Sequence, residues 1–212
     1  MNWRSRPKHS VIVCHPSKDS FTRAVADRYA FAVRAVGHEV ELRDLYAIGF
    51  DPVLKDAERP STQGSALAED VGTELELLAG SDIFVLVYPI WFGMPPAMLK
   101  GYVDRVFGAG FSHRAVREQM MHPLMNGKAL LSFTSSGSSR AWLDEQGAFE
   151  SLRNVFDTYM RHAFSLASAR RVHFDNIVEH AKRNYIDQCL FDVEQEARKA
   201  AADLLVPMLD RK

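Results

Sequence analysis

A cluster of hydroxyl side chains follows the first apolar run of the sequence. The segment HPSKDSFT carries His15, Ser17, Ser20 and Thr22, with Phe21 between the last two, just where a helical pattern begins. Hydroxyls beside the free N–H groups of a helix start are typical ligands of an anion such as a phosphate. Neither G-x-x-x-x-G-K-[ST] nor G-x-G-x-x-G occurs in the chain, which argues against a P-loop or a conventional dinucleotide site. The alternative is an ordinary helix cap at Ser20.

A second segment, YPIWFGMPP, places aromatic side chains between prolines. Pro89 precedes Ile90, Trp91 and Phe92, and a Pro95-Pro96 pair follows. Because proline fixes the backbone and lacks an N–H donor, the intervening residues can hold one shape against a flat ligand. The alternative for Trp91 and Phe92 is a satellite of the hydrophobic core.

The third segment, TSSGSS, is rich in small polar residues. Its members Thr134, Ser135, Ser136 and Gly137 offer hydroxyls and main-chain N–H groups suited to the polar edge of a ring. The alternative is a flexible serine turn. Taken jointly, a phosphate cradle, an aromatic wall and a polar rim describe a site like that for flavin mononucleotide.

The elements that must position these segments alternate regularly along the chain. Strands are expected at residues 10–14, 38–45, 82–88, 128–133 and 170–174, and helices at 20–36, 67–78, 97–107, 149–162 and 185–209, with a polar loop over 55–65. This order predicts a flavodoxin-like, doubly wound α/β fold: a five-stranded parallel sheet in three α/β/α layers, with residues 1–212 as one domain. Ligands of such a sheet bind outside the carboxyl ends of the strands, where all three segments fall.

Composition narrows the function classes. The 212 residues include 26 Lys and Arg against 27 Asp and Glu, a formal net charge of -1, so no field draws in nucleic acid or an anionic membrane. Cys14 and Cys189 lie outside any C-x-x-C spacing, and the eight histidines show no metal-ligand spacing, so we expect neither a disulfide nor a metal. The first apolar run is too short for a signal or a membrane span, which predicts a cytoplasmic protein.

Four segments together carry a family resemblance: HPSKDSFTRAV, DLYAIGFDPVL, YPIWFGMPPAMLKGYVDRVFGAGF and TSSGSS. With them the chain resembles the NAD(P)H:quinone oxidoreductases, DT-diaphorase-like flavoproteins that include bacterial NAD(P)H dehydrogenases. The resemblance implies a homodimer with bound FAD or FMN. It also implies hydride transfer from NAD(P)H to the flavin and ping-pong delivery of two electrons to a quinone-like acceptor.

The resemblance also assigns site residues. The first segment would surround the flavin phosphate, the proline-flanked segment would line the isoalloxazine, and the serine segment would reach its polar rim. The chain departs from the family pattern at the proton-handling residues. Trp142 and Ala148 stand where the family has a Tyr and a His, and GFSH places His113 where a pocket tyrosine is common. We therefore expect His113 and Trp142 at the catalytic positions.

Two other functions stay open at the sequence level. A flavodoxin-like electron carrier fits less well, because such carriers are strongly acidic and shorter. An ancillary flavoprotein that activates a glutathione-regulated potassium efflux channel shares the His-Pro after the first strand. The sequence does not distinguish FMN from FAD, or NADH from NADPH.

Overall fold

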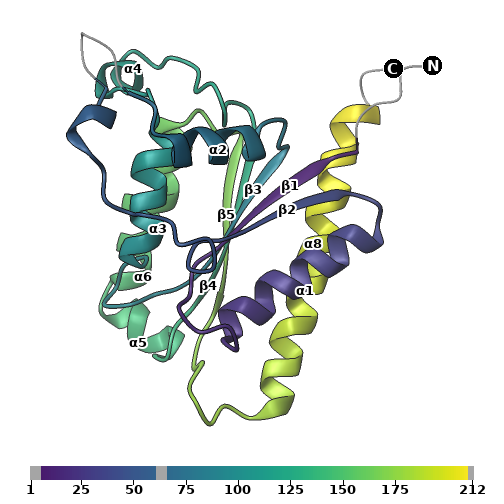
Figure 1. The fold of residues 1–212 in the computed structure, drawn as a ribbon. Coiled ribbons are helices and arrows are strands. Elements are labelled where there is room, and N and C mark those ends of the chain that lie inside the picture. Colours follow the sequence, from purple (N-terminus) through teal and green to yellow (C-terminus); the bar gives the residue numbers. More distant parts are fainter. Residues whose placement is uncertain (1–5, 61–65, 210–212) are drawn as a thin grey trace.

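A single parallel sheet forms the centre of the computed structural model, which describes residues 6–60 and 66–209. Its five strands run in the order β2-β1-β3-β4-β5, as shown in Figure 1. They are β1 (Lys8–Val13), β2 (Glu39–Asp44), β3 (Ile83–Pro89), β4 (Ala129–Ser135) and β5 (Ser168–Phe174). The predicted flavodoxin-like α/β class is confirmed. Residues 1–5 of the N-terminal segment and 61–65 of the predicted polar loop lie outside the described residues.

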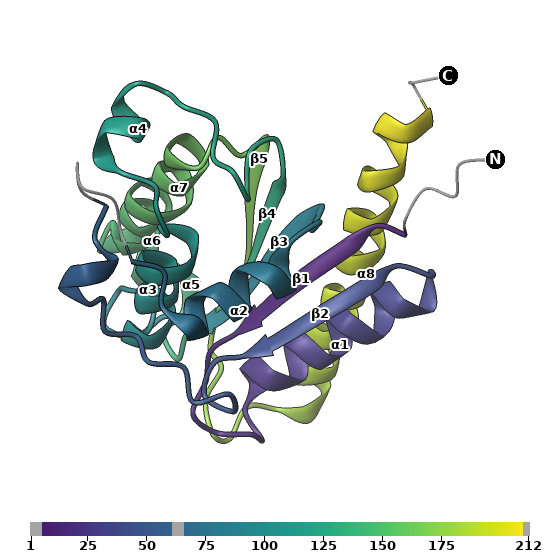
Figure 2. The ribbon, with the colours of Figure 1, turned by 45° about the horizontal axis from the view of Figure 1, so that its top comes forward.

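Helices cover both faces of the sheet (Figures 1 and 2). One face carries α1 (Phe21–Ala35) and α8 (Arg183–Leu209), and the other carries α2 (Glu69–Leu78) and α3 (Ala97–Tyr102) together with α6 (Ala148–Leu152) and α7 (Tyr159–Ala163). Every residue of the central strand β3 is buried, because its side chains alternate between the two cores. Within the described residues, no helix is both long and apolar enough to cross a membrane.

Several helices differ from the sequence prediction. The helix expected at 97–107 is α3 followed by a π-helical turn, η2 (Val103–Phe107), and the one expected at 149–162 divides around a second such turn, η3 (Arg153–Thr158). Three short elements were not predicted: η1 (Asp56–Glu58), α4 (His113–Arg117) and α5 (Arg140–Glu145). With three to six residues each, they are too short to show a helical period in the sequence.

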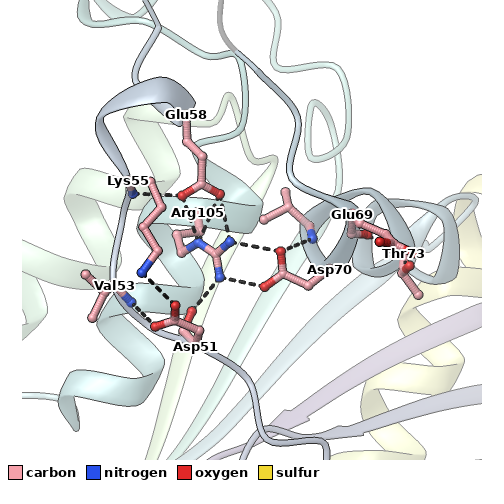
Figure 3. A network of polar contacts seen from close by, with 9 residues as sticks. Asp51, Val53, Lys55, Glu58, Glu69, Asp70, Thr73 and Arg105 are labelled. Atoms are coloured by element: carbon pink, nitrogen blue, oxygen red, sulfur yellow. Dashed lines mark hydrogen bonds and ion pairs between the residues drawn. The ribbon is translucent and has the colours of Figure 1, made fainter.

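An arginine from η2 holds the connection between β2 and α2 in place (Figure 3). Arg105, whose side chain is 3% exposed, pairs with Glu58 of η1 at 2.8 Å and with Asp70 of α2 at 2.7 Å. It also donates to the carbonyl oxygen of Asp51. One turn earlier, a Cβ at Gly101 would clash with the main chain of Pro52, so only glycine admits this close approach.

We predict that Arg105→Met lowers the free energy of unfolding by about 3 kcal/mol, because it leaves the Glu58 carboxylate buried without its partner. Urea denaturation of both proteins measures the difference. The matched control is Lys100→Met, in the same helical segment, where the pair with Asp104 is exposed on both sides. That change should cost under about 1 kcal/mol. Equal losses in the two variants would contradict the anchoring role of Arg105.

Candidate functional site

Main-chain hydrogen bonds of the sheet continue past the strand ends and fix the loops that follow. Cys14 N donates to Val87 O at 2.9 Å, and Ile90 N donates to Ser135 O at 2.7 Å. Ser136 N donates to Phe174 O at 3.0 Å. The residues that open the loops after β1, β3 and β4 are therefore set by the register of the sheet itself.

These loops enclose a cavity of about 760 Å³, within the range of small-molecule sites. Most of the residues predicted from the sequence line it. They are His15, Ser17, Ser20, Phe21, Thr22, Pro89, Ile90, Trp91, Ser135, Ser136 and Gly137. The structure thus brings together, at one end of the sheet, residues that lie more than 120 positions apart in the chain.

The start of α1 offers donors to the cavity. Ser20 Oγ accepts from Arg23 N at 3.1 Å, so the helix-cap interpretation of Ser20 is confirmed. Its hydroxyl proton stays available, because a hydroxyl has one donor beside its acceptor sites. The N–H groups of Phe21 and Thr22 have no acceptor among the described residues. Two carboxylates, Asp19 and Glu179, also line the cavity. The donors nevertheless give this end of α1 the character of an anion cradle.

The aromatic loop is a tight turn closed by Trp91 and Met94, which exchange two main-chain hydrogen bonds of 3.0 Å. Its central residues, Phe92 and Gly93, have φ of 51° and 79°. The Trp91 ring, 39% exposed, lies 5.7 Å from the His15 ring between centroids. The turn presents Trp91 to the cavity and leaves Phe92 entirely in solvent.

A histidine to which the sequence analysis gave no role, His173, orders the polar loop. His173 Nε2 lies 3.1 Å from Ser136 Oγ, and Nδ1 lies 2.9 Å from Thr134 Oγ1. Burial first, then the charges of Arg140 and Arg171, lower the pKa of His173 to about 4, so the ring is neutral at pH 7. Ser136 donates its proton to Ser138 O at 2.8 Å, so His173 Nε2–H donates to Ser136. His173 Nδ1 then accepts from Thr134 Oγ1, because the other acceptor within reach of that hydroxyl, Val172 O, is farther away at 3.4 Å.

Four predicted residues do not line the cavity. Thr134 is buried beneath it and contacts His173, while Phe92 and Trp142 are exposed. His113 opens α4, which lies at the opposite end of the sheet from α5 and from the start of α1 in Figure 1. The predicted roles of these residues stay predictions. Among the described residues, no three His, Cys, Asp or Glu side chains gather to hold a metal ion.

The loop after β5 forms a wall that the sequence analysis missed. Ile177, Val178 and Ala181 line the cavity, together with Ile186 of α8. Ile177 N also donates to Ser136 O at 2.9 Å, which ties this loop to the polar one. Its segment DNIVEHAK has no hydroxyl or aromatic pattern. The usable signal was topological, since this loop also follows the carboxyl end of a strand.

Comparisons with known proteins agree with this fold. The family model described as flavodoxin-like fold matches residues 7–203. An uncharacterized NAD(P)H oxidoreductase from Haemophilus influenzae is 35% identical over 147 residues, 69% of this chain and 72% of that protein. NAD(P)H dehydrogenase (quinone) 1 of Cavia porcellus is 35% identical over 146 residues, 60% of this chain but only 53% of that protein. A solved NAD(P)H:quinone oxidoreductase from Methanothermobacter marburgensis has a TM-score of 0.79 at 25% identity, covering 92% of this chain and 98% of that one.

Phe92 combines a left-handed backbone with a side chain that packs against nothing. We predict that Phe92→Asn leaves the free energy of unfolding of the ligand-free protein unchanged or raises it by up to about 1 kcal/mol, because Asn tolerates this backbone better than Phe. Phe31→Asn, at an exposed position inside α1, is the control and should bring no gain. Denaturant titration measures both. A loss above about 1 kcal/mol at Phe92 would show that its ring stabilises the fold.

Proposed function

Since this chain belongs to the flavodoxin-like fold family, we propose that it is a flavin-dependent oxidoreductase that transfers hydride from NAD(P)H to quinones or similar small aromatic acceptors. A bound flavin supplies the hydride chemistry, and the protein supplies binding and orientation. The names of the guinea pig and archaeal relatives support this choice of donor and acceptor. Residues 1–212 act as one flavin-binding domain in this proposal.

The observation that carries the proposal is the convergence of three kinds of wall on one cavity. The free N–H groups of Phe21 and Thr22, with the Ser20 hydroxyl, fit the flavin phosphate. Trp91 offers a face to the isoalloxazine, and Ser136, fixed by His173, offers polar groups to its rim. The flavin is FMN or FAD, and both share the phosphate and the ring system that these walls fit.

The proposal includes an assembly of two copies, as the resemblance to the quinone oxidoreductases implies. Large apolar side chains are exposed on the aromatic loop, on α5 and around η3, and a homodimer would give them a partner. They are Met94, Trp142, Val155 and Tyr159. A homodimer would also give His113, remote from its own chain's cavity, a route to the flavin of the other copy. The two cysteines are free and buried, which suits the reducing cytoplasm.

The decisive experiment is on the cofactor. We expect purified protein to bind FMN or FAD and NAD(P)H to bleach the flavin anaerobically, with mass spectrometry of the released cofactor separating FMN from FAD. Trp91→Ala should weaken flavin binding roughly tenfold, because a stacked ring loses its partner.

The matched control for that variant is Phe31→Ala, an exposed aromatic on α1 that does not line the cavity. Its flavin affinity should equal that of the parent protein. Absence of binding to either flavin would overturn the proposed function, whereas normal binding by Trp91→Ala would overturn only the role of that ring.

His113 tests the acceptor half-reaction. We predict that His113→Ala slows oxidation of the reduced flavin by a quinone roughly 10²-fold, as expected on removal of a positioned proton donor, and leaves reduction by NAD(P)H unchanged. Anaerobic stopped-flow absorbance follows each half-reaction separately. Arg114→Ala, the next residue of α4, is the control. A change of less than about twofold would remove His113 from the mechanism.

A further inference from the structure

A second cavity, of about 470 Å³, lies beside β5, between this strand and the helical segment from α5 to α7. Ten residues line it, and half of them are arginines. The arginines are Arg140, Arg153, Arg161, Arg170 and Arg171. Asp157 is the one carboxylate in the lining, although the chain as a whole carries slightly more acidic than basic residues. Positive charge is therefore concentrated around this cavity.

The carboxylates around the cavity leave most of the arginine donors unused. Arg170 points away from the cavity, because it pairs with Glu196 of α8 on the other face of the sheet. At the cavity itself, Asp144 accepts from Nε of Arg140, and Glu150 accepts from Nη2 of Arg153. Each guanidinium has five N–H donors, so every one of these side chains keeps nitrogens without an acceptor among the described residues. Arg161 has no ion pair within the described part of the chain. The pairs with Asp144 and Glu150 are also exposed, so solvent weakens them.

Arg171 gives a second, independent indication. Its side chain is 4% exposed, pairs with Asp157 at 2.8 Å and donates from Nη2 to Tyr88 Oη at 3.2 Å. Its Nε and Nη1, like both carboxylate oxygens of Asp157, have no hydrogen-bond partner among the described residues. Phe149 lies against it, with the ring centroid 5.7 Å from the guanidinium carbon and the Arg140 guanidinium 3.6 Å from the same ring. Buried donors without acceptors are costly, and a ligand with several acceptor oxygens would satisfy them.

The two cavities share a wall. His173 lines the arginine cavity, Ser136 lines the first cavity, and a hydrogen bond joins the two side chains, so the cavities are neighbours. The proposed hydride donor is a nucleotide whose reacting ring and phosphates are far apart, so its phosphate would lie beyond the cavity that holds its ring.

We propose that the arginine cavity is a binding site for a phosphate monoester. Arginine forks match phosphate oxygens bidentately, and a dianion with three acceptor oxygens suits several guanidinium groups better than a single carboxylate does. Two sources carry this group: the 2′-phosphate of NADPH, which rests on the proposed function, and a separate phosphorylated small molecule.

The test uses the protein as purified, with inorganic phosphate as the probe. Calorimetric titration at constant ionic strength should show saturable binding that the double variant Arg153→Gln, Arg161→Gln weakens at least tenfold. Both side chains are exposed, so the fold should survive. Arg117→Gln, an exposed arginine at the end of α4, is the control and should bind phosphate normally. Absence of phosphate binding, or equal binding by the double variant, overturns the proposal.

Kinetics then identify the source of the phosphate. If the double variant loses at least tenfold in kcat/KM for NADPH but not for NADH, the ligand is the 2′-phosphate of the donor. If phosphate binding falls and both nucleotides react as before, the ligand is a separate phosphorylated molecule. Should neither nucleotide reduce a flavin, the proposed function fails, and the titration alone still decides the phosphate site.

Discussion

Parallel pairing of the strands is the constraint on which the candidate site depends. The hydrogen bonds that run from Ile90 to Ser135 and from Ser136 to Phe174 continue the ladder of the sheet into the loops. A slip of one residue in either pairing would turn each following side chain to the opposite face. The aromatic and polar loops therefore need no anchoring of their own at their first residues, since the buried strands that precede them set their position.

The connection between β2 and α2 has no strand partner, and ion pairs and one close main-chain contact hold it instead. Arg105 joins η1, α2 and the carbonyl of Asp51, and Gly101 lets the chain at Pro52 lie directly on α3. Arg105 and Glu58 are buried in this network, whereas the Asp70 side chain is about half exposed. The sheet is held by strand pairing and core packing. This crossover is held against the helices by the ion pairs of Arg105 and by the close approach that Gly101 allows.

The sequence predicted the sheet well because its apolar runs are long and continuous, and the loops after β1, β3 and β4 followed from topology alone. It failed where the signal is short or has no distinctive chemistry. The helices α4 and α5 span fewer than two turns, and the loop that contributes Ile177 carries no motif. His113 follows a segment that resembles the family pattern, but α3 runs antiparallel to the strands, so the chain reaches α4 at the amino ends of the strands (Figure 1). The doubly wound topology predicted from the sequence already implies this reversal, because a crossover helix returns the chain to the other end of the sheet.

The His173 imidazole lies between the two cavities, and the causes of its lowered pKa determine its charge state there. Burial is the first cause of the lowered pKa of His173, and the charges of Arg140 and Arg171 come after it. An anion beside these arginines would offset their charge and raise the pKa, but the burial that dominates would remain. The ring therefore stays mostly neutral at pH 7, with Nδ1 and Nε2 both engaged by hydroxyls. A ligand in the arginine cavity would therefore meet a neutral ring whose two nitrogens are already hydrogen-bonded to Thr134 and Ser136.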